Sequence, residues 1–156
     1  MYDSALWLHS LLRWAVLITG LVAWFRAIGG KTANRPWTPQ DELWGLLLTI
    51  SVDLQLLVGL ALYLVLSPIT KMAFTSFGTA MRIETTRFFA VEHPFAMLIA
   101  IAVIHVARVR IRKAVEPARK HRTALIFFGI ALILMIISIP WPFLPPPFVS
   151  RPLLHP

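Results

Sequence analysis

Four apolar stretches, each long enough to cross a lipid bilayer as a helix, dominate this 156-residue chain. A bilayer core of about 30 Å needs about 20 helical residues. We predict helices over residues 5–25, 43–66, 87–109 and 123–139. Charged residues make up 14% of the chain, whereas a soluble domain has about 25%. The sequence therefore predicts an all-α protein, an integral membrane four-helix up-down bundle over residues 1–142.

The segments between and after the spans have their own signals. Thr38, followed by Asp41, predicts the start of the second helix. Residues 67–86 are expected to form a loop that lies on the membrane surface, and residues 110–122 a basic connector. Prolines stop the last helix and recur through residues 143–156, so this tail is expected to be extended.

Basic residues predict the orientation of the bundle. Cytoplasmic connectors of membrane proteins carry an excess of Lys and Arg. The two connectors on one side are rich in them, with Arg26, Lys31, Arg35, Arg108, Arg110, Arg112, Lys113, Arg119, Lys120 and Arg122. The other side has Lys71, Arg82, Arg87 and Arg151. Both termini are therefore expected on the non-cytoplasmic side of a bacterial inner membrane. The first span follows an acidic leader and contains Arg13, so we expect it not to be a cleaved signal peptide.

Two histidines are expected at the outer ends of two spans. His9 opens the first span and His93 opens the third. The first and third helices of an up-down bundle start on the same side, so the two imidazoles can meet at one depth. Two facing imidazoles in an apolar bundle can bind a haem iron from both sides. The alternative is a pair of interfacial histidines without a metal.

Arg13 lies four residues after His9 and so shares its helix face. An arginine within a span is costly unless it has a partner. Haem propionates would be suitable anionic partners, because guanidinium binds carboxylate in a fork. The alternatives are an ion pair with Asp53 in the second span or an extended side chain that reaches the interface.

A second haem between His105 and His121 is also compatible with the sequence. His105 lies deeper in the third span, and His121 opens the fourth on the inner side, within a basic run in which a surface histidine is ordinary. Asp53 is expected to pair with Arg13, to hydrogen-bond His105, or to move protons.

Composition excludes several other kinds of chemistry. The chain has no cysteine, which excludes disulfides, iron–sulfur clusters and covalently attached haem. The net charge is +8. The basic residues that produce it lie beside apolar spans, so we expect contacts with anionic lipid and none with nucleic acid. Met72, Met81 and Met97 could attract copper, but methionines without regular spacing more often fill gaps in a core.

Several motifs together resemble one family. They are residues 8–14 (LHSLLRW), 54–63 (LQLLVGLALY), 91–94 (VEHP), 120–122 (KHR) and 139–142 (IPWP). They resemble small bacterial four-helix membrane proteins that are commonly labelled cytochrome b. The resemblance implies a bundle with non-covalent haem b. Such relatives often have a histidine at the position of Asp53, so this chain lacks a ligand there, which weakens the second haem site more than the first.

Two functions are compatible with these observations. The first is a b-type cytochrome, an electron-transfer protein rather than an enzyme with its own substrate. It would work in a respiratory or photosynthetic chain, within a larger redox complex and with a quinone as one partner. The second is a subunit without a cofactor that stabilises a larger membrane complex.

Overall fold

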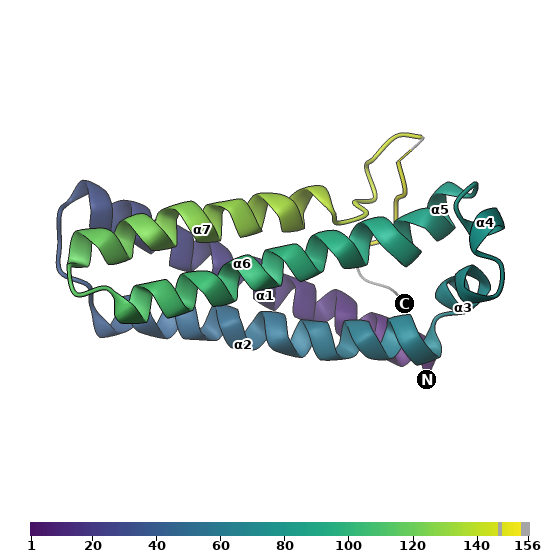
Figure 1. The fold of residues 1–156 in the computed structure, drawn as a ribbon, viewed down its shortest axis with the longest axis horizontal. Helices are drawn as coiled ribbons and strands as arrows, with labels where there is room; N and C mark the ends of the chain where they lie inside the picture. The colour runs from purple at the N-terminus through teal and green to yellow at the C-terminus, as the bar shows by residue number, and fades with distance from the viewer. Residues whose placement is uncertain (147, 154–156) are drawn as a thin grey trace.

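A computed structural model describes residues 1–146 and 148–153 of the chain. Four long helical segments form its body (Figure 1). They are α1 (Tyr2–Thr32), α2 (Pro39–Ala61) with the π-helical turn η1 (Leu62–Leu66), α6 (His93–Lys113), and α7 (Pro117–Ile137). Between η1 and α6 lie α3 (Pro68–Thr75), α4 (Phe77–Ala80), α5 (Glu84–Arg87) and the π-helical turn η2 (Phe88–Glu92).

All four long segments are long and apolar enough to cross a membrane: Tyr2–Thr32, Pro39–Leu66, Glu84–Lys113 and Pro117–Ile137. This confirms the prediction of an all-helical, multi-pass membrane protein. The helices are longer than predicted at most ends. The length of an apolar run indicates only the part of a helix that lies in the bilayer core. The backbone hydrogen bonds of the helix continue into the flanking polar residues until a helix-breaking residue ends them.

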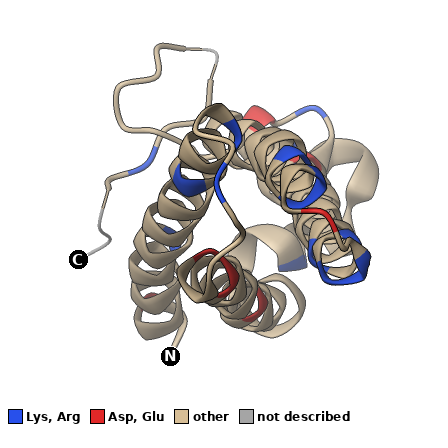
Figure 2. Cartoon of the chain, turned by 90° about the vertical axis from the view of Figure 1, so that its left-hand side faces the viewer, with Lys and Arg blue, Asp and Glu red and all other residues tan. Residues whose placement is uncertain are grey.

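The two ends of the molecule differ. The connections after α1 and after α6 lie at one end, and the N-terminus, α3–α5 and the C-terminal segment lie at the other (Figure 1). Figure 2 looks onto the first end, where several basic segments surround the helix connections. The predicted basic connector 110–122 is mostly helical, because α6 continues to Lys113 and α7 begins at Pro117.

The start of α2 confirms the predicted signal. The Thr38 side chain accepts a hydrogen bond from the Asp41 backbone N–H, and the Asp41 carboxylate accepts one from the Thr38 N–H at 2.9 Å. This reciprocal cap satisfies two donors that would otherwise lack partners at a helix start. Pro39 follows in the first turn, where its missing N–H costs nothing.

The predicted loop over residues 67–86 contains three short helices. Ser67 caps α3 and Pro68 occupies its first turn, so the local signals for a helix were present. Phe74 and Phe77 remain more than half exposed. That they lie on the membrane surface stays a prediction.

The core is narrow and rich in alanine. Ala100 and Ala107 of α6 and Ala124 and Ala131 of α7 are almost fully buried. Small residues let transmembrane helices approach closely. Larger buried side chains fill the rest: Leu48, Val52, Ile104, Ile111 and Phe128. Helix α1 packs against α2 and α7, and α6 packs against α7, whereas α2 and α6 touch less.

After α7, the chain turns back over the end of the bundle. The Trp141 indole donates to the carbonyl of Ile136 at 2.8 Å, and the Arg151 backbone N–H donates to the carbonyl of Pro140 at 3.0 Å. Residues 143–146 and 148–153 contain turns and no helix. The remaining residues of the predicted extended tail, 147 and 154–156, lie outside the described part of the chain.

Candidate functional site

His9 of α1 and His93 at the start of α6 lie side by side. Their ring centroids are 6.3 Å apart and their planes are inclined by 71°. They come from segments 84 positions apart in sequence, and the structure brings them to the same depth of the bundle. The predicted meeting of these two imidazoles is therefore present in the structure.

The position of His93 depends on an interruption of its helix. Pro94 has no N–H to donate to the carbonyl of Ala90, four residues earlier. The Tyr63 hydroxyl donates to this carbonyl instead, at 2.8 Å. The backbone N–H of His93 bonds to the carbonyl of Phe88, five residues earlier, as in a π-helix. Such π-turns inside helices are frequent at functional sites.

His93 also has a partner for one ring nitrogen. Its Nδ1 lies 2.9 Å from the backbone carbonyl of Ser138, just after α7. A carbonyl accepts, so this nitrogen carries the proton and Nε2 is the unprotonated one. Metal-binding histidines commonly have this arrangement, which fixes ring and tautomer.

His9 is held by α2. The Gln55 side-chain amide donates to the backbone carbonyl of His9 at 3.0 Å. Gly59 leaves room for the ring, because a Cβ at that position would lie 3.3 Å from His9 Cε1. The Nδ1 atom of His9 is buried and has no hydrogen-bond partner in the described part of the chain. A buried polar atom without a partner is costly and calls for an explanation.

Both histidines line one cavity of about 460 Å³ between α1, α2 and α6. Its walls are largely apolar and include Leu17, Leu56 and Ile101. Cofactor pockets typically measure about 300–1,000 Å³. Leu60, Phe95 and Leu98 line the cavity and are also exposed on the outer surface, so the cavity opens sideways between α2 and α6.

Two arginines line the same cavity, Arg13 and Arg151. Arg13 donates to the backbone carbonyl of Leu153, and its Nε is buried without a partner among the residues that the structure describes. The Arg151 guanidinium lies over the ring of Phe89, 4.5 Å from its centroid. Among the described residues, neither arginine forms an ion pair with a carboxylate. The structure therefore does not contain the ion pair between Arg13 and Asp53 that was one alternative for Arg13.

The cavity contains residues of the kinds that could hold a haem iron. A metal–imidazole bond is about 2 Å long, so two imidazoles on opposite faces of one iron have ring centroids about 6 Å apart. The 6.3 Å separation of His9 and His93 agrees with this distance. The two arginines supply the cationic groups that carboxylates on a bound group would need.

His105 and Asp53 pair with each other. His105 Nε2 lies 2.9 Å from Asp53 Oδ1, and each side chain is 47% exposed. Of the three roles expected for Asp53, the hydrogen bond to His105 is the one that the structure contains.

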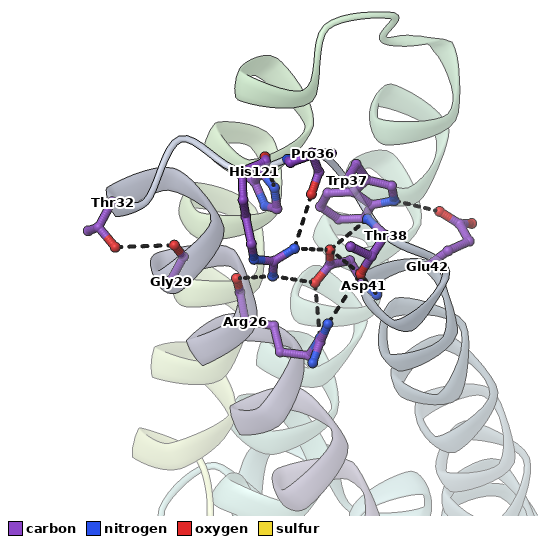
Figure 3. Close-up of polar contacts among 10 residues, drawn as sticks. Arg26, Gly29, Thr32, Pro36, Trp37, Thr38, Asp41, Glu42 and His121 are labelled. Carbon is purple, nitrogen blue, oxygen red and sulfur yellow. Dashed lines mark hydrogen bonds and ion pairs between the residues drawn. The ribbon is translucent and has the colours of Figure 1, made fainter.

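His121 is fully buried in a different environment (Figure 3). Its Nε2 lies 3.2 Å from the carbonyl of Arg35, and its ring centroid is 5.0 Å from that of Trp37. It packs against Gly30, where a Cβ would overlap the ring. His105 and His121 thus have separate partners, and no contact between them is present among the described residues. Of the two predicted histidine pairs, His9 with His93 is the one that the structure brings together.

The end of the bundle near His121 is held by ion pairs. Asp41 accepts from Arg26 at 3.0 Å and from Arg35 at 2.6 Å (Figure 3). Hydrogen bonding to Asp41 raises the pKa of Arg35 above its ordinary value. Glu42 accepts from Arg108 at 2.6 Å, joining α2 to α6. These bonds fix helix positions at the end opposite to the cavity.

Sequence reasoning missed three contributors to the cavity. Gly59 gives space to His9, Ser138 supplies the carbonyl for His93, and Arg151 adds a second cation. A glycine inside an apolar span is a detectable signal for close packing. The carbonyl of Ser138 and the return of Arg151 depend on how the tail folds back, which no spacing in the sequence reveals.

In the described part of the chain, no group of three His, Asp or Glu side chains lies close enough together to bind a metal ion. Met81 packs on the small cluster of Ala73, Ala80 and Ala90, whereas Met97 packs on the main core. This separation favours gap-filling over copper binding for these methionines.

Comparison with known proteins gives no match, since no family model, curated protein or solved structure is significantly similar to this chain.

Proposed function

We propose that this chain is a b-type haem protein of the membrane, in which His9 and His93 would hold the haem iron. The observation that carries the proposal is the approach of these two imidazoles, from α1 and α6, within an apolar cavity. The buried Nδ1 of His9, which has no partner among residues 1–146 and 148–153, supports it further.

The residues around the cavity would have different roles in holding the haem. The Ser138 carbonyl holds the His93 ring through Nδ1 and leaves Nε2 for the metal. Gly59 permits the His9 ring to stand between α1 and α2. Arg13 and Arg151 would bind the acidic groups of the cofactor, and the apolar walls would keep water away. Bound haem would supply a one-electron redox couple.

The biological setting follows from the same proposal. With two histidine ligands the metal has no open position, so the protein would transfer electrons without a substrate of its own. The basic end, with the connections after α1 and α6, would face the cytoplasm of a bacterium, with both termini on the other side of the inner membrane. A membrane quinone and a larger respiratory or photosynthetic complex are the partners that fit this role.

A reduced-minus-oxidised absorption spectrum of the purified protein tests the proposal. Cells supplied with haem should yield protein with sharp haem b bands, and His9→Ala and His93→Ala should each abolish them. His105→Ala is the matched control, and we expect it to keep the full signal because His105 lies outside the cavity.

Three results would contradict the proposal or part of it. Absence of haem bands in the unsubstituted protein would leave the second function, a subunit without its own cofactor. Full spectra in both His9→Ala and His93→Ala would exclude this ligand pair. Loss of half of the signal in His105→Ala would point to a second haem.

A further inference from the structure

The Asp53–His105 pair lies on the outer surface of the bundle. Both side chains are 47% exposed, and they bridge α2 and α6, which pack less closely than the other neighbouring helices. Six apolar residues are exposed one or two turns away on these helices: Leu46, Ile50 and Leu57 on α2, and Leu98, Ala102 and Val109 on α6. We call these six residues, with Asp53 and His105, the α2–α6 face.

The depth of this pair makes its exposure costly. Asp53 is central in the span Pro39–Leu66, and at 1.5 Å per residue it lies about 20 Å from either end. A side chain of this length cannot reach the interface from there. Ionisable residues within membrane spans almost always face protein or a water-filled cavity. Within the described part of the chain, nothing covers the exposed half of Asp53 and His105, so we expect another molecule to cover them.

The pair also has unused hydrogen-bonding capacity. Only Asp53 Oδ1 and His105 Nε2 take part in the bond between them. Among the described residues, Asp53 Oδ2 and His105 Nδ1 have no partner. Because the carboxylate accepts at Oδ1, His105 Nε2 carries the proton of this bond, and a second proton on the pair, at Nδ1 or at Oδ2, would leave one donor and one acceptor available. The missing partner should therefore offer one donor and one acceptor at the same depth.

We propose that the α2–α6 face binds a second copy of this chain in a two-fold symmetric dimer. Both copies insert in the same orientation, so the axis runs along the membrane normal. Rotation by 180° about that axis places α2 of one copy opposite α6 of the other. His105 Nδ1 of each copy then lies against Oδ2 of the other copy's Asp53, and one proton is shared between these two atoms. The four side chains form a closed ring in which both polar pairs are covered.

The surrounding side chains suit this arrangement. Ala102 lies one turn before His105 and is exposed, so the backbones can approach closely there. Leu57 and Val109 would pack above and below the polar ring. The proposal is independent of haem, because none of the eight residues except Leu98 lines the cavity.

Cysteine cross-linking in native membranes tests the proposal, and the chain suits it because it contains no cysteine. Ala102→Cys and Ile50→Cys lie near the proposed axis and should form a disulfide-linked species of twice the 17.6 kDa chain mass on mild oxidation. Ile18→Cys and Ile133→Cys, exposed on α1 and α7, are the matched controls and should stay monomeric. Equal cross-linking at all four positions, none at any, or a product that contains a different protein would overturn the proposal.

A second variant isolates the polar ring. In the Ala102→Cys background, Asp53→Leu with His105→Leu should raise the dimer dissociation constant about tenfold, which is the scale for interhelical hydrogen bonds in membranes. Leucine suits a lipid-facing position, so the monomer should keep its helical circular dichroism. Unchanged dimerisation in this folded variant would overturn the proposal.

Discussion

At the residue scale, adjacent glycines in α1 have opposite roles. Gly30 faces α7, and the ring of His121 occupies the space that its side chain would fill. Gly29 points to open space, because no neighbouring side chain lies within 4 Å of the position that a Cβ would take. The sequence shows only a Gly-Gly pair, which predicts a loop, yet the helix continues through both. Close packing of His121 explains why one of them cannot carry a side chain.

Gly30→Ala should therefore lower the free energy of unfolding by about 1–3 kcal/mol, the usual cost of overpacking. Gly29→Ala is the matched control and should raise it by up to about 1 kcal/mol, because alanine favours a helix. Thermal unfolding in detergent measures both. Equal effects of the two substitutions would show that His121 does not pack against Gly30 in this way.

At the element scale, the π-turn η2 determines where His93 lies. Pro94 removes the N–H that an α-helix would direct at the carbonyl of Ala90, and Tyr63 supplies a hydroxyl in its place. The interruption thus connects the end of α2 to the start of α6. The sequence predicted that the third span begins at Arg87, which places Pro94 inside it. In the structure the helical segment begins at Glu84 and continues through Pro94, with η2 directly before α6.

Tyr63→Phe should cost about 1–3 kcal/mol of stability, because it leaves the buried carbonyl of Ala90 without its hydroxyl donor. In a Pro94→Ala background, the restored backbone N–H can bond to this carbonyl, so the same substitution should cost less. A double-mutant cycle of unfolding free energies measures this coupling. If Tyr63→Phe costs the same in both backgrounds, the hydroxyl does not replace the missing N–H.

At the scale of the whole molecule, the two ends of the bundle are built differently. One end is held by charged residues, with Asp41 and Glu42 at the start of α2 bonded to arginines from α1, the following loop and α6. The other end contains the cavity with His9 and His93, covered in part by the returning tail. This division places the ion pairs of Asp41 and Glu42 away from the candidate haem site.

Single cysteines should report the proposed orientation. Glu116 lies between α6 and α7, and Ser76 lies between α3 and α4; both are exposed. On intact cells, a membrane-impermeant thiol reagent should label Ser76→Cys and not Glu116→Cys, and permeabilised cells should show labelling of both. Labelling of Glu116→Cys alone on intact cells would show that the protein has the opposite orientation in the membrane.

Residue order alone was enough to predict a helical chain with four segments long and apolar enough to cross a membrane. Those properties follow from apolar length and from local signals such as Thr38 with Asp41, which act within one segment. The order of the spans also predicted that His9 and His93 would meet, since it places both at one end.

The partners of the remaining polar groups became known only from the packing of the helices. Asp53 had several candidate partners in the sequence, and packing of α2 beside α6 selected His105. His121 became a buried packing residue because Gly30 and Trp37 surround it. Hydrogen bonds and ring contacts form only when side chains from distant segments come within a few ångströms of each other. The rotation of each helix and the position of the tail determine these distances, and the spacing of residues in the sequence does not encode them.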